Sequence, residues 1–458
     1  MCTLFSAFVR SHLVSPLPFC PNSARPCAGE FDDYVQCTEC SRWFHFVCGM
    51  YPAPEQCPRQ WRLEAQLFVC PHCVPSVVPP PSKALTGAAA KEFARRSKLL
   101  SLQTRRAADL PTCALSDAIE AHLASELKSK GVELPSPIVV RVVSRKRLIF
   151  PAVKEVKQRY GSAYAAEFPY LSQAILCFQS IGSPRRDVLL FAVYVQEYDA
   201  YCPPPNTNRT YISYVDSVPY LESSPPNART PVYHAVLGGY LKHAAACGFE
   251  HCHLWVAPPE GQTEYVFHAR PVDGRPPMSA DVLRGWYERL LAKAQQTGSV
   301  TRVADLSQHV ADLTSVRNFP LFDGDFFPDR MEKVMEKSKH PGGGDHAKSG
   351  GGNGNGKNAK GGGKVTMLAR SETLEIADQM KREVSGSNYS FLVATLNSAK
   401  DPLQVGREKQ ITSHELIDDR ERFLELCMHR HWQFDQLRRA QWSTMMLLAL
   451  LGGSPDTE

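Results

Sequence analysis

The sequence lacks the features that mark membrane and secreted proteins. No apolar run approaches the roughly 20 residues that span a bilayer, and the longest runs, Val188–Val195 and Met445–Leu451, have the length of core segments. The faintly hydrophobic N-terminus is interrupted by Arg10 and His12, and no small-residue cleavage site follows it. We therefore expect neither a membrane partner nor a secretory signal.

The chain also has no large excess of positive or negative residues. The formal net charge is +5 over 458 residues, which neither favours nor excludes a polyanionic partner. The hydrophobic share of 43%, against 22% charged residues, indicates a folded chain of two or three domains. The 15 cysteines are an odd number; those before position 80 have the spacing of metal ligands, and the others are scattered among apolar residues. This pattern is typical of a reducing compartment and not of a disulfide framework.

Composition divides the chain into a small and a large domain. Residues 20–75 are rich in cysteine, histidine and aromatic residues, and residues 76–109 predict a proline-rich linker followed by a basic helix. Residues 110–451 form the large domain, which is interrupted at 338–366 by a segment rich in glycine and lysine. That segment has too little apolar surface to offset the entropy of ordering, so we expect it to be disordered.

The large domain contains a strand–helix–strand pattern. The stretch CPPPNTNRTYISYVDSV (202–218) ends in β-branched and aromatic residues, which predict a strand that delivers Asp216 and Ser217 to a defined point. The following ARTPVYHAVLGGYLKHAAACGF predicts a helix that stops near Gly248. HCHLWVAPP then returns as a strand, so the order predicts a βαβ unit.

Three pairs of residues in the small domain have the spacing of zinc knuckles. They are Cys37-x2-Cys40, His45-x2-Cys48 and Cys70-x2-Cys73. Paired soft ligands at this spacing hold tetrahedral Zn²⁺. The alternative is that the cysteines are small buried apolar residues.

These pairs resemble a PHD finger, in which two zinc ions are held by interleaved pairs. The resemblance implies that Cys37, Cys40, Cys70 and Cys73 form one complete site, and that His45 and Cys48 need two ligands upstream. Cys20 is followed by Ser23 where a paired cysteine would stand, and Cys27 is the remaining substitute. Whether Cys20 and Cys27 complete a second site stays open.

The start of the predicted helix has the residues of an anion site. Thr230 is placed as its N-cap, with Pro231 at the first helical position and Arg229 just before. Free N–H groups, the helix dipole and a guanidinium all favour phosphate. Ser217, at the end of the preceding strand, can face the same point. The alternative is that the Thr-Pro pair is only a helix cap.

Motifs spread over the large domain resemble those of the CREB-binding protein family of histone acetyltransferases. They are, in order, FPYLSQAILCF, VQEYDAYCPPPNTNRTYISYVDSV, ARTPVYHAVLGGYL, HLWVAPP, EYVFHARP, LRGWYERLL, FDGDFFP and ITSHELIDDRERFLELCMHRHWQFDQLRRAQWSTMMLLALL. The likeness runs from about Leu110 to Leu451. It implies an acetyl-CoA-dependent lysine acetyltransferase domain of the α/β (α+β) class, with a central mixed sheet flanked by helices, preceded by a small zinc-stabilised finger.

The resemblance also assigns roles to single residues. Contacts to acetyl-CoA fall near the end of the 202–218 stretch, at the start of the next helix and on one later tryptophan: Val215, Asp216, Ser217, Arg229, Thr230, Tyr233 and Trp286. Tyr287 takes the role of the general acid that protonates the departing thiolate, and Trp255 lines the tunnel in which the acceptor lysine is desolvated. From its periodicity alone, WYERLL is an ordinary amphipathic helix, and Trp286 and Tyr287 would belong to the core. Ala257 replaces a family cysteine, so we expect altered packing there and no loss of chemistry.

Basic substrate tails need acidic receivers. The resemblance assigns this role to Asp323, Asp418 and Glu421, with Ser172 nearby; the alternative is a solvated helix start, which takes negative charge in any case. The implied partners are histone H3 and H4 tails, chromatin and transcription factors. The implied location is the nucleus, and the implied role is that of a transcription coactivator.

Two other functions compete with this prediction. One is a catalytically decayed chromatin adaptor that reads histone tails through the finger, and the joint retention of Arg229, Thr230, Trp255, Trp286 and Tyr287 argues against it. The other is nucleic-acid binding through KEFARRSK and SLQTRR. Both stretches are short and lack interleaved aromatic residues, so we expect no direct sequence-specific DNA binding.

Overall fold

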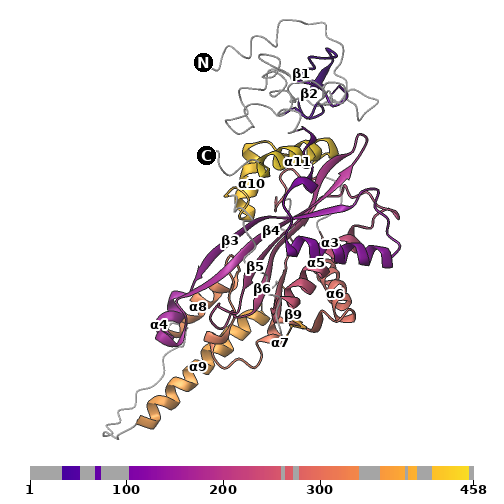
Figure 1. Cartoon of the computed structure of the whole chain (residues 1–458). Coiled ribbons are helices and arrows are strands. Elements are labelled where there is room, and N and C mark those ends of the chain that lie inside the picture. The colour runs from indigo at the N-terminus through magenta and orange to yellow at the C-terminus, as the bar shows by residue number, and fades with distance from the viewer. Residues whose placement is uncertain are drawn as a thin grey trace, which may run out of the picture.

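A seven-stranded sheet forms the centre of the large domain (Figure 1). The computed structural model describes residues 34–51, 68–73, 103–258, 264–271, 278–339, 362–386, 390–399 and 415–452. The strands of this sheet are β3 (Ile138–Pro151), β4 (Glu167–Ile181), β5 (Arg186–Tyr198), β6 (Arg209–Ser217), β7 (His251–Val256), β8 (Val300–Asp305) and β9 (Ser390–Leu396). Within the described residues, no helix combines the length and the apolar character needed to cross a lipid bilayer.

The sheet is mixed. Its strand order is β3-β4-β5-β6-β7-β9-β8, and neighbouring strands are antiparallel except for β6 and β7. A parallel pair needs a crossover connection, and helix α5 (Arg229–Ala246) lies between β6 and β7 in the chain. The predicted βαβ unit and the central mixed sheet flanked by helices are both confirmed.

The other helices fall into two groups by the apolar cluster they join. Buried residues of α3, α5, α6, α10 and α11 belong to one cluster, and those of α4, α7, α8 and α9 belong to a second. Their bounds are α3 (Ala114–Ser129), α4 (Lys154–Tyr160), α6 (Ala280–Gln296), α7 (Leu306–His309), α8 (Phe327–Lys339), α9 (Gly362–Ser385), α10 (Arg420–His429) and α11 (Leu437–Leu451), with 3-10 turns at Ala107–Asp109, Gly161–Ala163 and Val316–Asn318. In Figure 1, α3, α5 and α6 lie together, while α4, α8 and α9 lie at the end of the sheet that is far from the N-terminal domain.

Helices α3 and α5 pack directly against each other. The apolar residues Leu115, Ile119, Leu123 and Leu127, which are spaced four apart and so share one helical face, are buried in α3. On α5, a Cβ added at Gly239 would lie 3.0 Å from the Ile119 Cα, so glycine allows this close approach of the two backbones. The helix ends at Ala246, and Gly248 follows with a φ of +91°, the left-handed conformation typical of a helix stop.

The small N-terminal domain, called the finger here (residues 34–51 and 68–73), is docked on the large domain. Its strands β1 (Tyr34–Gln36) and β2 (Trp43–His45) pair antiparallel. The indole N–H of Trp442 in α11 donates to the Tyr51 carbonyl at 2.9 Å. Gln103 donates to the Met50 carbonyl at 3.2 Å, and the Met50 side chain is buried within the first apolar cluster of the large domain. Figure 1 shows α11 between the finger and the sheet.

Helices occupy both ends of the segment 338–366, for which the sequence predicts disorder. Helix α8 extends to Lys339, and α9 begins at Gly362. Residues 340–361 lie outside the described residues, as do Cys20, Cys27 and the predicted linker from 76 to 102. The domain boundaries therefore stay predictions.

Three histidines cluster near Arg209, the first residue of β6: His251 and His253 on β7 and His309 on α7. Arg209 Nη1 lies 3.0 Å from His253 Nε2 and 3.2 Å from His309 Nε2, and the rings of His251 and His309 are 5.0 Å apart. A guanidinium only donates, so both Nε2 atoms accept and both imidazoles are neutral. Burial, followed by the charge of Arg209, lowers the pKa of His251 to about 3 and of His309 to about 4, and holds the pKa of His253 well below its usual value.

We predict that this cluster makes the fold sensitive to acid. Because the folded-state pKa values lie below the unfolded value of about 6.5, the stabilisation is complete above pH 6.5 and is lost as the pH falls towards 4. For each additional proton that the unfolded chain binds, the free energy of unfolding falls by at most about 1.4 kcal/mol per pH unit. The effect is smaller for His251 and His309, which are partly exposed. Urea unfolding between pH 7 and pH 4.5 should give a shallower pH dependence for His309→Gln than for the wild type. Identical slopes would contradict this assignment.

Candidate functional site

The first turn of α5 is fixed against the end of β6. Tyr233 is buried; its ring stacks on Phe191 with centroids 4.3 Å apart, and its hydroxyl donates to the Val218 carbonyl at 3.4 Å. Phe191 in turn pairs with Ser217 across β5 and β6. Arg229 is half-buried at the start of the same helix. The structure therefore brings the end of β6 and the start of α5 together, as the sequence predicts.

The N-cap of α5 is Ala228, so the prediction of Thr230 as the N-cap is wrong. Arg229, Thr230 and Pro231 occupy the first three helical positions. Proline is tolerated there because the first N–H groups of a helix have no intrahelical acceptor. No side chain caps this helix at Ala228. The N–H groups of the first turn and the half-buried Arg229 and Thr230 thus fit an anionic group such as the phosphates of acetyl-CoA.

Asp216 holds a loop against the end of β6. Its Oδ2 accepts from the backbone N–H of Val266 at 3.0 Å and of Phe267 at 3.3 Å, and its Oδ1 lies 3.1 Å from a guanidinium nitrogen of Arg270. The carboxylate is buried, and burial raises the pKa of Asp216 while Arg270 and the backbone donors oppose the shift. Both carboxylate oxygens are engaged within the protein.

A cation–aromatic group joins this loop to α10. The guanidinium of Arg420, the first residue of α10, lies 4.8 Å from the ring centroid of Tyr214 and 5.2 Å from that of Tyr265. It also donates to the Tyr265 carbonyl at 2.8 Å, and the two tyrosine rings meet edge to face at 5.6 Å. Burial raises the pKa of both tyrosines, so both hydroxyls remain protonated at neutral pH.

Trp286 and Tyr287 lie at the interface of α5 and α6. The Trp286 ring meets Tyr287 edge to face at 5.0 Å and His234 of α5 at 4.4 Å. Tyr287 is buried, and burial raises the pKa of its hydroxyl. Burial also lowers the pKa of His234 to about 4, so this imidazole is neutral. Tyr287 therefore offers a neutral, protonated phenol at neutral pH.

Trp255 and Val215 lie on neighbouring strands but join different apolar clusters. Trp255 stands one residue before the end of β7, with its ring parallel to that of Phe391 in β9 at 5.9 Å. It packs on the second cluster, whereas Val215 and Tyr287 belong to the first. The structure brings Tyr287 together with Trp286 and places Trp255 in a separate aromatic group.

The predicted substrate residues gather over β3, β4 and β5. Ser172 of β4 stands in register between Lys146 of β3 and Gln196 of β5. Gln196 donates to the Asp323 carbonyl at 2.8 Å, and Lys146 Nζ lies 2.9 Å from Asp418 Oδ2. Asp418 is buried, and its Oδ1 accepts from the Ser144 hydroxyl. Glu421, on α10, is paired with its neighbour Arg420.

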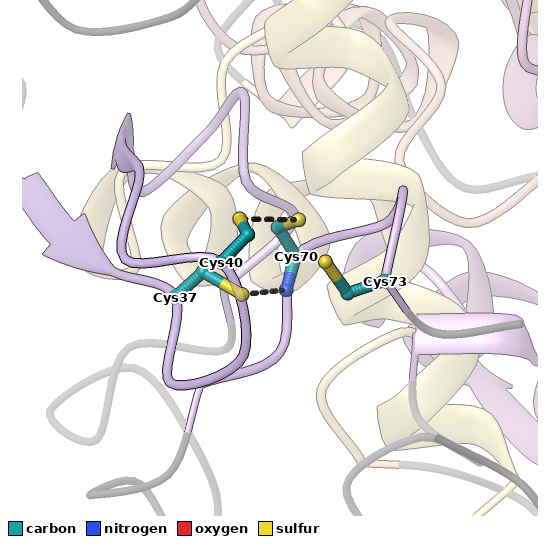
Figure 2. Close-up of side chains that lie close together, drawn as sticks. All are labelled: Cys37, Cys40, Cys70 and Cys73. Atoms are coloured by element: carbon teal, nitrogen blue, oxygen red, sulfur yellow. Dashed lines mark hydrogen bonds between the residues drawn. The ribbon is translucent and has the colours of Figure 1, made fainter. Parts of the chain in front are cut away.

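The four cysteines predicted to form a complete zinc site converge (Figure 2). The Sγ atoms of Cys37, Cys40, Cys70 and Cys73 all lie within 4.8 Å of one another, and those of Cys40 and Cys70 are 3.8 Å apart. Tetrahedral zinc with Zn–S distances of about 2.3 Å places its sulfur ligands about 3.8 Å apart. These residues therefore fit Zn²⁺, which would crosslink the turn after β1 to the segment 68–73.

His45 and Cys48 are both buried, at the end of β2 and in the turn that follows. Arg438 Nη1 of α11 donates to Cys48 Sγ at 3.6 Å. The upstream ligands that a second zinc site would need lie outside the described residues, so the roles of His45 and Cys48 as ligands stay a prediction.

Sequence reasoning missed Tyr214, Tyr265, Arg270 and Arg420 as parts of the site. All four lie inside motifs that carry the family resemblance: the 202–218 stretch, EYVFHARP and IDDRERF. Their spacing contains no signal of a shared site, because the loop at 264–271 and the start of α10 are about 150 residues apart in the chain and are brought together by the fold, as the Arg420–Tyr265 contact shows.

The chain is similar to known histone acetyltransferases. A family model described as "Histone acetyltransferase domain KAT3" matches residues 124–404. Among curated proteins, "Probable histone acetyltransferase HAC-like 2" of Oryza sativa subsp. japonica is 30% identical, with 93% of this chain and 34% of the relative covered. "Histone acetyltransferase HAC1" of Arabidopsis thaliana is 28% identical, with coverage of 91% and 28%. "Protein cbp-1" of Caenorhabditis elegans is 25% identical, with coverage of 91% and 21%.

The chain spans about a third or less of the length of these curated relatives. The matched family span begins at residue 124, downstream of the finger, so the PHD identity of the finger stays a prediction.

We predict that the cysteine cluster binds one zinc ion. Replacing a ligand removes one of four thiolates, so Cys40→Ser and Cys73→Ser should each lower the zinc content by about one equivalent, measured by elemental mass spectrometry on purified protein. Cys247→Ser, outside the cluster, serves as the control and should retain the wild-type zinc content. An unchanged zinc content in both ligand variants would refute the site.

We predict that Asp216→Asn loosens the 264–271 loop. The amide keeps one acceptor oxygen and loses the ion pair with Arg270, so the free energy of unfolding should fall by about 1–3 kcal/mol. Hydrogen exchange at the amides of Val266 and Phe267 should accelerate. Asp378→Asn, an exposed ion-pair residue on α9, should change the stability by less than about 1 kcal/mol. Equal effects of the two substitutions would argue against the assignment.

Proposed function

Because the chain belongs to the KAT3 histone acetyltransferase domain family, we propose that it is an acetyl-CoA-dependent lysine acetyltransferase that acts on histone tails. The family match over residues 124–404 carries this proposal. That span contains nearly all of the proposed cofactor, catalytic and substrate residues, from Ser172 to Asp323; Asp418 and Glu421 follow it.

The start of α5 is proposed to bind the phosphates of acetyl-CoA, which supplies the acetyl group as an activated thioester. The N–H groups of the first turn and the helix dipole favour negative charge. Arg229 adds a guanidinium and Thr230 a hydroxyl at the same place. Ser217 and Val215, at the end of β6, are proposed to contact the pantetheine arm, with Tyr233 and Trp286 packing beside them.

Asp216 is proposed to lie at the cofactor together with Val215 and Ser217, and its buried side chain is proposed to hold them in position. Both of its carboxylate oxygens are engaged by Val266, Phe267 and Arg270. Its neighbours Val215 and Ser217 are thereby held at a fixed distance from the 264–271 loop. The role is that of a positioning residue.

Tyr287 is proposed to be the general acid. The neutral lysine amine attacks the thioester carbonyl carbon and the carbon–sulfur bond breaks. The Tyr287 hydroxyl gives its proton to the departing sulfur, and the proton lost by the lysine nitrogen passes to solvent, from which Tyr287 is reprotonated. Because burial raises its pKa, the Tyr287 hydroxyl keeps its proton at neutral pH until a thiolate appears beside it. Trp255 is proposed to line the apolar approach of the lysine, where desolvation lowers the pKa of the ammonium and favours the reactive amine.

Histones, chromatin and transcription factors are the proposed partners, and the nucleus is the proposed location. The relatives named histone acetyltransferases support the substrate class. We propose a role as a transcription coactivator. We propose that the finger stays docked on α11 while it functions. Trp442 donates to the Tyr51 carbonyl and Gln103 to the Met50 carbonyl, which holds the finger against the large domain.

We predict that Tyr287→Phe abolishes most of the transfer and leaves the fold intact. Loss of a general acid should lower kcat by about 100-fold or more, measured as transfer of radiolabelled acetyl from acetyl-CoA to core histones by the zinc-loaded full chain. Binding of CoA, measured by calorimetry, should be retained.

Tyr201→Phe is the matched control, because Tyr201 is 91% exposed. It should keep the wild-type rate. If the wild-type protein folds and binds CoA but transfers no label, the catalytic proposal falls and a chromatin adaptor becomes the function to pursue.

A further inference from the structure

Four carboxylates lie around the start of α10 and the loop before α8, and we call them the receiver acids: Asp323, Asp418, Asp419 and Glu421. Three of them have a cation partner within the protein. Asp418 pairs with Lys146 at 2.9 Å, Asp419 with Arg422 at 3.2 Å, and Glu421 with Arg420. The fourth, Asp323, accepts a hydrogen bond from the neutral hydroxyl of Tyr170. Most of the negative charge of the receiver acids is therefore already balanced.

The pair of Lys146 and Asp418 is the most buried of the three. The Asp418 side chain is 3% exposed and that of Lys146 is 33% exposed. Ser144, on the same strand as Lys146, donates to the other carboxylate oxygen. The group that solvent or a peptide meets at this point is therefore an ammonium and not a carboxylate.

A cationic side chain of a substrate would gain little here. To reach Asp418 it would have to displace Lys146 from a buried carboxylate, and it would meet the charge of that ammonium on approach. A substrate cation could not easily replace Arg420 beside Glu421 either. The Arg420 guanidinium is also held by the Tyr265 carbonyl and by the rings of Tyr214 and Tyr265.

We propose that this surface accepts a lysine whose neighbours in the peptide are uncharged, and that Lys146 determines this specificity by occupying Asp418. The inference rests on the proposed acetyltransferase function and specifies its substrate class. Lysines in neutral segments of a tail are acetylated as well as lysines inside basic runs. Lys146 is a specificity residue here and takes no part in the transfer itself.

The experiment uses two peptides that differ only in the residues flanking one acceptor lysine, Gly-Lys-Gly and Arg-Lys-Arg. For the wild-type full chain, loaded with zinc, kcat/KM should differ by less than about threefold between them. Lys146→Gln exposes the charge of Asp418, so the ratio should shift by about five- to tenfold towards the basic peptide. That shift should shrink as the salt concentration rises, because screening weakens an exposed charge.

Two controls separate specificity from damage to the fold. Lys146→Arg keeps a cation on Asp418 and should retain the wild-type ratio. Arg147→Gln removes a charge from the next residue of β3, whose side chain is 77% exposed and 3.9 Å from Asp199; because successive side chains of a strand point to opposite faces, it should leave the ratio unchanged. Thermal unfolding of all three variants reports on folding.

The outcomes are distinguishable. A wild-type preference of more than about threefold for the basic peptide, or a Lys146→Gln ratio equal to that of the wild type, would overturn the inference and leave the acetyltransferase proposal standing. If the wild-type chain acetylates neither peptide, the proposed function and this inference fall together.

Discussion

The buried carboxylate of Asp216 is the interaction on which the candidate site depends. A carboxylate with 5% exposure is stable only when both oxygens are hydrogen-bonded or paired. Asp216 meets this requirement with the Ser217 N–H and, from the loop at 264–271, two backbone N–H groups and Arg270. That loop then reaches two further elements: the Tyr265 carbonyl accepts from Arg420 of α10, and the His268 carbonyl accepts from the Phe434 N–H just before α11. One carboxylate thus ties the end of β6 to the C-terminal helices.

Helix α11 plays a corresponding part between the central sheet and the finger. Its Thr444 hydroxyl oxygen accepts from the Leu189 N–H of β5, and its Gln441 donates to the Ile181 carbonyl at the end of β4. The same helix binds the finger through Trp442 and Arg438. A zinc-stabilised finger docked on a helix that contacts the central sheet is coupled to that sheet, so loss of metal removes support from both.

Electrostatics distinguish the two sides of the site. The start of α5 presents uncapped N–H groups and Arg229, which suit an anion. The receiver acids, by contrast, are mostly paired within the protein. A surface that is rich in acidic residues by sequence can therefore have little net charge to offer, because ion pairs formed in the fold consume it. Counting carboxylates along the chain overstates the attraction for a basic tail.

The sequence by itself determined the elements and the chemistry that each could carry. Local sequence patterns located β6, α5 and β7, and the spacing of Cys37, Cys40, Cys70 and Cys73 predicted a zinc site, because these signals are local. Only the tertiary structure decided that the Asp216 carboxylate faces a loop 50 residues away, that Arg420 covers Tyr214 and Tyr265, and that Lys146 neutralises Asp418 across 272 residues of chain. Such pairings depend on which side chains the sheet and helices bring to one place. The prediction of the α5 N-cap failed for a related reason. A Thr-Pro pair suits more than one position in the first turn of a helix, and here the N-cap is Ala228, whose N–H donates to the Ser223 hydroxyl oxygen.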